Sequence, residues 1–81
     1  MELTVLYFAQ VRQAAVSSSE AIEVEEGAAL SDVVEEVVRR HPGLEPFRSS
    51  LLLTRNQEWA KPGTPVQEGD EIGLMPPVSG G

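Results

Sequence analysis

Short apolar segments separated by polar loops run along the chain, and five of them have the pattern of β-strands. They cover residues 3–8, 20–25, 51–54, 58–60 and 71–75. The first and the last are apolar on both faces, which is typical of strands in the centre of a sheet. The segment 20–25 alternates charged and apolar residues, which indicates a half-buried edge strand. We therefore expect the first and last strands to be neighbours at the centre of one sheet.

One segment has the periodicity of a helix. Its apolar residues recur at i, i+3, i+4, i+7 and i+8 and are Leu30, Val33, Val34, Val37 and Val38. This spacing places them in one stripe along a helix, which Pro42 and Gly43 would stop. We expect a helix over residues 30–41, a loop over 9–19 and a short turn or single helical turn over 44–49.

An apolar helical stripe needs a sheet face to cover, so the order of these elements predicts a two-layer α+β domain. Two strands, one helix and three further strands are typical of the β-grasp, or ubiquitin-like, architecture. We expect a mixed sheet packed on one main helix. Residues 1–75 would form the β-grasp domain, and residues 76–81 would form an extended C-terminal tail.

Composition excludes several kinds of site and partner. The 81 residues include no cysteine and one histidine, His41, so we expect neither a disulfide nor a metal site. A formal net charge of -7 disfavours binding to nucleic acid, because the phosphates would be repelled. Apolar runs are too short to cross a membrane, and the first residues lack the basic region of a signal peptide. We therefore expect a cytoplasmic protein whose partners present basic surfaces.

The last six residues have a composition suited to entering another protein. They are Pro76, Pro77, Val78, Ser79, Gly80 and Gly81. Two prolines hold an extended geometry, and glycines without side chains can pass through a narrow channel. The reacting group would be the carboxylate of Gly81, with the residues before it inserted in the partner.

A carboxylate must be activated before it reacts as an electrophile, typically by adenylation with ATP. The chain has no P-loop or other glycine motif that cradles phosphates, and no cysteine that could supply sulfur. We therefore expect no cofactor bound by this chain, with ATP used by an activating partner. These features favour a carrier of cargo over an enzyme that works alone.

Strand alternation predicts a docking patch beside the tail. If Leu3, Val5 and Tyr7 face the helix, then Phe8 faces away from it, and so does Met75 of the last strand. With Trp59 they would form an exposed apolar patch, which suggests a partner-docking surface. Arg12, just after the first strand, could pair with an acidic group of that partner, and a solvated surface arginine is the alternative. Completion of a thin core is the alternative role for Phe8 and Trp59.

The stretch from Gly69 to Gly81, GDEIGLMPPVSGG, resembles the C-terminus of the small, MoaD-type subunit of molybdopterin synthase, in the MoaD/ThiS family of sulfur carriers. The opening VLYFAQVR, residues 5–12, is similar to the family's first strand and turn, and Asn56-Gln57 stands where the family commonly has a turn. Met75 departs from the family's frequent phenylalanine, and Ala29 replaces a common Ser or Thr helix cap.

The resemblance implies a function and a set of partners. Gly81 would be adenylated by a MoeB-type, E1-like enzyme and converted to a thiocarboxylate, with sulfur from a source such as a cysteine desulfurase or a rhodanese-like protein. The tail would then enter a MoaE-type large subunit, in a heterotetramer that holds the active site. There it would give its sulfur to cyclic pyranopterin monophosphate, which becomes molybdopterin in molybdenum cofactor biosynthesis.

Other functions remain open on the same residues. A ThiS-like carrier for thiamine thiazole synthesis would have the same fold and the same Gly-Gly thiocarboxylate, although such chains usually lack the Pro-Pro-Val before it. A ubiquitin-like protein modifier, a carrier for tRNA thiolation and an interaction module with an idle tail are further alternatives.

Overall fold

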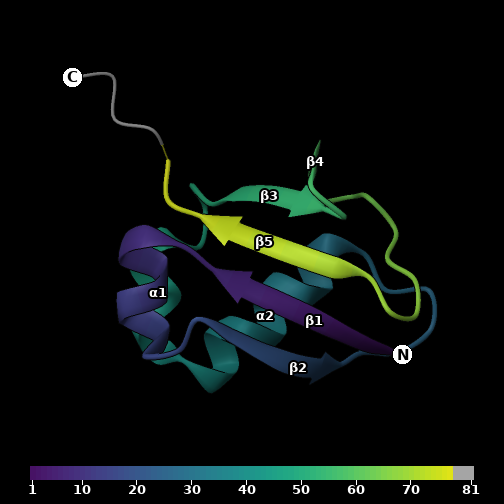
Figure 1. The fold of residues 1–81 in the computed structure, drawn as a ribbon, viewed down its shortest axis with the longest axis horizontal. Helices are drawn as coiled ribbons and strands as arrows, with labels where there is room; N and C mark the ends of the chain where they lie inside the picture. The colour runs from purple at the N-terminus through teal and green to yellow at the C-terminus, as the bar shows by residue number, and fades with distance from the viewer. Residues whose placement is uncertain (78–81) are drawn as a thin grey trace.

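The computed structural model describes residues 1–77 and contains one five-stranded mixed sheet packed on a helix (Figure 1). In chain order the elements are β1 (Glu2–Tyr7), α1 (Ala9–Ala15), β2 (Ser19–Glu23), α2 (Leu30–Arg40), the 3-10 helix η1 (Pro42–Phe47), β3 (Leu52–Arg55), β4 (Glu58–Ala60) and β5 (Glu71–Met75). The expected α+β, β-grasp fold class is confirmed.

Strand order in the sheet is β2-β1-β5-β3-β4. The central neighbours β1 and β5 are parallel, with Val5 opposite Ile72, and the other pairs are antiparallel. The first and last strands therefore lie side by side in the middle, as their apolar composition predicts. Leu3, Val5 and Tyr7 of β1 are buried, as are Ile72 and Leu74 of β5.

Helix α2 covers one face of this sheet with the apolar stripe read from the sequence, and all five stripe residues are buried. Ala29, at the N-cap, offers no side-chain acceptor, but its backbone amide donates to Asp32 Oδ2 at 2.8 Å. Asp32 thus supplies a carboxylate to the first turn, where the helix dipole favours negative charge. Within residues 1–77, no helix is long and apolar enough to span a membrane.

The prediction of a loop over residues 9–19 was wrong, because α1 occupies Ala9–Ala15. A seven-residue helix is too short to be stable alone. Val11 and Ala15, at i and i+4, are both buried, so burial against the rest of the core stabilises this helix. Residues 44–49, expected to be a short turn or a single helical turn, lie largely within the 3-10 helix η1, and Leu44 joins the core.

Candidate functional site

Strand β5 carries the chain from the centre of the sheet to the tail. It ends at Met75, and Pro76 and Pro77 follow outside the ladder, because proline has no amide hydrogen to donate. Val78, Ser79, Gly80 and Gly81 lie outside the described residues. The expected insertion of the tail, the chemistry at Gly81 and the boundary between domain and tail therefore stay predictions.

Among residues 1–77, no helix covers the sheet face opposite α2, which lies toward the viewer in Figure 1. Strand register places Leu6, Gly73, Thr54 and Trp59 in one row across β1, β5, β3 and β4. Successive residues of a strand point to opposite faces, so this row is on the open face while Tyr7 and Leu74 are in the core. The neighbouring row pairs Leu52 with Met75. We call the apolar members of this face, Leu6, Phe8, Leu52, Trp59 and Met75, the open-face patch.

The side chains of Phe8 and Met75 both lie close to Gly73, near the end of β5. A Cβ atom added to Gly73 would lie 3.4 Å from Phe8 Cε2 and 3.4 Å from Met75 Cε. It would also lie 2.3 Å from Thr54 Oγ1, which is closer than real Cβ contacts come. Because Gly73 has no side chain, the Phe8 and Met75 side chains can approach its backbone closely. Its role was missed at the sequence level, although an isolated glycine in a strand indicates close approach of other groups.

Phe8 was expected in the first strand, but β1 ends at Tyr7 and Phe8 is the N-cap residue of α1. Its amide donates to the Leu74 carbonyl at 3.2 Å, and its own carbonyl accepts from the Arg12 amide at 3.2 Å. Phe8 is therefore held at the junction of strand and helix. Its side chain is 41% exposed, so much of the ring is available to a partner.

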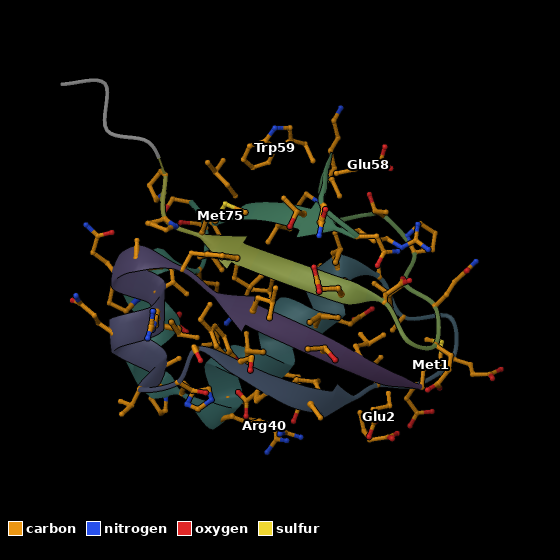
Figure 2. The ribbon with its side chains drawn as sticks, viewed as in Figure 1. Met1, Glu2, Arg40, Glu58, Trp59 and Met75 are labelled. Carbon is orange, nitrogen blue, oxygen red and sulfur yellow. The ribbon has the colours of Figure 1, made fainter. Side chains whose placement is uncertain are left out.

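Trp59 is 71% exposed and extends from β4 toward the same end of the molecule as Met75 (Figure 2). The preceding residues Asn56 and Gln57 have φ angles of 51° and 72°, as a tight hairpin turn requires. The expected turn at these residues is confirmed. In register Trp59 lies beyond Thr54 from Gly73, so it forms the outer end of the open-face patch.

Arg12 is exposed on α1, one helical turn after Phe8. No carboxylate among residues 1–77 forms an ion pair with it. Among the described residues the Arg12 guanidinium therefore has no carboxylate partner, and its backbone lies one helical turn from Phe8 of the open-face patch. Of the four residues predicted for docking, Phe8 and Met75 both approach Gly73, Trp59 lies two strands away from Gly73 in register, and Arg12 follows Phe8 by one helical turn.

A buried carboxylate fixes the start of β5, and its role was not foreseen. Asp70 accepts from Arg55 Nε at 2.6 Å, from Asn56 Nδ2 at 3.0 Å and from the Gln67 amide at 2.7 Å. Burial acts to raise the pKa of Asp70, but the hydrogen bonds from Arg55, Asn56 and Gln67 outweigh it and hold this pKa below its ordinary value. The carboxylate thus ties the β3–β4 hairpin to β5 in its charged form.

A second polar cluster lies at the β2 edge of the sheet. Glu20 of β2 accepts from the Tyr7 hydroxyl at 2.5 Å and contacts His41 Nε2 at 2.5 Å. Burial, then the hydrogen bond to Glu20, raises the pKa of the Tyr7 phenol. Burial would also raise the pKa of Glu20, but Tyr7, His41 and Arg40 together lower it. These contacts join β1 and β2 to the end of α2, which is a structural role.

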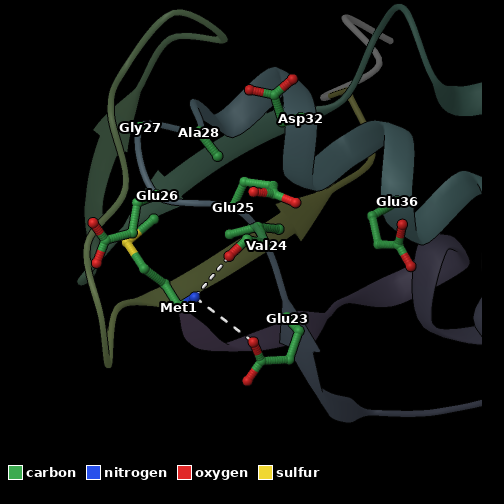
Figure 3. Close-up of a pocket in the computed structure, with 9 residues that line it drawn as sticks. All are labelled: Met1, Glu23, Val24, Glu25, Glu26, Gly27, Ala28, Asp32 and Glu36. Carbon is green, nitrogen blue, oxygen red and sulfur yellow. Dashed lines mark hydrogen bonds and ion pairs between the residues drawn. The ribbon is translucent and has the colours of Figure 1, made fainter.

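A concavity lies beside Met1, at the opposite end of β1 and β5 from Met75 (Figures 1 and 3). It is lined by Met1, Glu23, Val24, Glu25, Glu26, Gly27, Ala28, Asp32 and Glu36. The Met1 ammonium donates to the Val24 carbonyl at 2.7 Å and lies 3.6 Å from Glu23 Oε2. Within the described part of the chain, no group of three metal-ligating side chains comes together, here or elsewhere.

The chain is similar over its whole length to proteins of known role. It is 32% identical to the molybdopterin synthase sulfur carrier subunit of Chlamydomonas reinhardtii, with both chains covered completely. It is 35% identical to the molybdopterin synthase sulfur carrier subunit of Homo sapiens, over 99% of this chain and 94% of the human one.

A third relative has a different name. Small archaeal modifier protein 1 of Haloferax volcanii is 33% identical over 91% of this chain and 94% of its own. The crystal structure of this archaeal protein superposes with a TM-score of 0.89, covering both chains completely at 31% identity. The ThiS family model matches residues 5–81. The chain therefore belongs to the ThiS family.

Proposed function

We propose that this protein is the sulfur-carrier subunit of a molybdopterin synthase and carries sulfur as a thiocarboxylate on Gly81. One observation carries the proposal: relatives with that name match this chain from end to end. The position of the tail supports it, because β5 leads from the centre of the sheet into Pro76 and Pro77 beside an open apolar face.

The chain's own part in the chemistry is presentation. Asp70 holds β5 to the hairpin by buried hydrogen bonds, so the tail leaves a rigid base. Activation of the carboxylate would require ATP bound by an adenylating enzyme, because this sequence has no phosphate-cradling glycine motif. Sulfur transfer to cyclic pyranopterin monophosphate would occur in a large subunit that receives the tail, so the chain is not an enzyme on its own.

Docking would use the open-face patch. Phe8, Met75 and Trp59 offer apolar area next to the tail's root, and burial of such area stabilises protein interfaces. Arg12 would pair with a carboxylate of the partner at the edge of the same surface. The formal charge of -7 would favour encounter with a basic partner surface. The large subunit and the adenylating enzyme would use this face in turn, since each must receive the same tail.

Intact mass spectrometry tests the carrier role directly. The chain is incubated with a MoeB-type adenylating enzyme, ATP and a sulfur donor, and we expect one oxygen to be replaced by sulfur at Gly81. Deletion of Gly81 is the matched control, and it should abolish the change while the circular dichroism spectrum stays the same. Addition of a MoaE-type subunit and the pyranopterin should then return the carboxylate. An unchanged mass with a competent activating enzyme would contradict the proposal.

A role as a protein modifier is the second candidate, favoured by the likeness to small archaeal modifier protein 1. In that case the activated Gly81 would form stable amides with lysines of other proteins. Linked products that survive reduction and denaturation would support it. Sulfur delivery to a thiazole precursor in place of the pyranopterin would instead support the thiamine alternative.

A further inference from the structure

Lys61 is the single lysine of the 81 residues, and the other five basic side chains are arginines. Lysine carries a primary amine that can be acylated once it loses its proton, whereas the arginine guanidinium stays protonated in proteins. Among its side chains, the protein therefore offers one amine to an activated carboxyl group. This matters because the proposed function makes such a carboxyl group at Gly81.

The Lys61 side chain emerges from a turn that is well anchored. The Lys61 amide donates to Thr64 Oγ1 at 3.2 Å, and the Lys61 carbonyl accepts from the Thr64 amide at 2.9 Å. The next residue, Pro62, accepts from the Ser31 amide at 2.8 Å, which ties the turn to the start of α2. Chemistry on the side chain would thus disturb none of the contacts that hold its backbone.

The amine itself is accessible. Lys61 is exposed, and within residues 1–77 no carboxylate forms an ion pair with it. It follows β4 two residues after Trp59, so it stands next to the outer end of the open-face patch. A protein that covers this patch would have the lysine at the border of its interface.

The backbone amine at the start of the chain is in a different state. The Met1 ammonium donates to the Val24 carbonyl at 2.7 Å and faces Glu23, and its side chain is largely buried. Either amine must lose a proton before it attacks. The Met1 amine would also have to break this hydrogen bond, whereas the Lys61 amine has no ion pair to break among the described residues, so acylation should favour Lys61.

We propose that Lys61 is a modification site, at which the activated Gly81 of a second copy of this chain forms an isopeptide bond. The inference rests on the proposed function, because it needs the Gly81 carboxylate to be adenylated by an ATP-dependent enzyme. The deprotonated Lys61 amine attacks the acyl carbon, the bond from that carbon to the AMP oxygen breaks, and AMP leaves. The amine's second proton passes to water. Because one lysine is present, repeated linkage produces a chain of a single type.

The experiment separates donor from acceptor. The donor is K61R, which keeps the charge and can be activated but cannot accept. The acceptor is a variant that lacks Gly81, which keeps Lys61 but cannot be activated in the same way. They are mixed with the adenylating enzyme, ATP and magnesium without a sulfur donor, then examined by denaturing electrophoresis and tandem mass spectrometry. The control acceptor combines K61R with the Gly81 deletion.

A linked dimer with the Gly81–Lys61 bond, absent with the control acceptor, is the expected result. Linkage at Met1, or equal dimer with both acceptors, would overturn the assignment of Lys61. Release of pyrophosphate by the donor without any dimer would also overturn it, while the carrier function would stand. No activation of the donor at all would contradict the proposed function, and this inference with it.

Discussion

Arg55 Nε donates to Asp70 Oδ2 at 2.6 Å, from the end of β3 to the residue that precedes β5. The Asp70 side chain is 7% exposed and that of Arg55 is 30% exposed. A charge at this depth is stable only with hydrogen bonds to its oxygens, and Asn56 and the Gln67 amide provide two more. Asp70, directly before β5, thus has a structural role, which is to hold the strand that leads to the tail.

Replacement of Asp70 by alanine should destabilise the fold by about 2 kcal/mol, because several charge-assisted hydrogen bonds disappear and Arg55 loses its partner. Urea unfolding followed by circular dichroism measures this loss. The control is Glu26→Ala, an exposed carboxylate for which we expect a change within about 0.5 kcal/mol. Equal stability of the two variants would show that the Asp70 contacts do not contribute.

The same pair predicts how stability depends on pH. The pKa of Asp70 is lower in the folded state than in the unfolded state, where an aspartate has a pKa of about 3.9. Its contribution is therefore complete above that unfolded value and is lost as pH falls through the folded value. The difference in unfolding free energy between the wild type and Asp70→Asn should be constant from neutral pH to mildly acidic pH and shrink below about pH 4. A difference that grows on acidification would contradict the assignment.

Gly73→Ala should destabilise the protein by about 1–2 kcal/mol, since its new methyl group collides with the Thr54 hydroxyl. Removal of that hydroxyl in Thr54→Ala should relieve the collision. The double variant is then more stable than the sum of the two single changes predicts, by about 1 kcal/mol. Chemical denaturation of all four proteins measures this coupling. If the effects of the two single changes were strictly additive, the cost of the new methyl group would not come from its contact with Thr54.

Trp59→Ala should weaken binding to the large subunit while leaving the fold intact. Trp59 is 71% exposed, so loss of its ring costs little stability. If it anchors the interface, truncation costs about 2 kcal/mol, or roughly 30-fold in Kd. Isothermal titration calorimetry measures this change. The matched control is Val16→Ala, another exposed apolar side chain but outside the open-face patch, and a similar loss there would argue against a localised docking face.

Replacement of Val16 by glycine should increase the stability of the protein. Val16 is a β-branched residue with a φ angle of 55°, at the C-cap of α1, and it is 89% exposed. The left-handed region is costly for residues with a Cβ atom, so Val16→Gly should stabilise the protein by about 1 kcal/mol. Ser18→Gly, at an exposed position without positive φ, should lose a few tenths of a kcal/mol instead. Thermal unfolding compares the two variants.

The main elements could be predicted because their apolar periodicity is strong. The stripe of Leu30 to Val38 and the apolar strands at both ends of the chain indicate burial directly, and the observed sheet and α2 agree with them. Helix α1 could not be found in this way. Phe8 supplies no capping oxygen, and two buried residues, Val11 and Ala15, are too few to show a periodicity.

The candidate site was predicted in part for the same reason. Alternation along a strand indicates that Met75 faces away from the core, and one step beyond β1 it correctly leaves Phe8 exposed. It does not show that both side chains approach Gly73, or that Trp59 lies apart at the outer end of the patch. Arg12 was selected as a residue after a strand, whereas it is on a helix. The prediction for Gly81 awaits the experiments above.

The order of residues alone establishes which segments bury apolar side chains, where proline ends the last strand, and that one lysine and no cysteine are present. Those properties are local, since they depend on spacing and on residue chemistry. The parallel pairing of β1 with β5 brings Phe8 close to Gly73 and Met75. The register of β3 against β5 brings Arg55 close to Asp70. Such contacts join residues far apart in the chain, so they exist only once the whole sheet has assembled on α2.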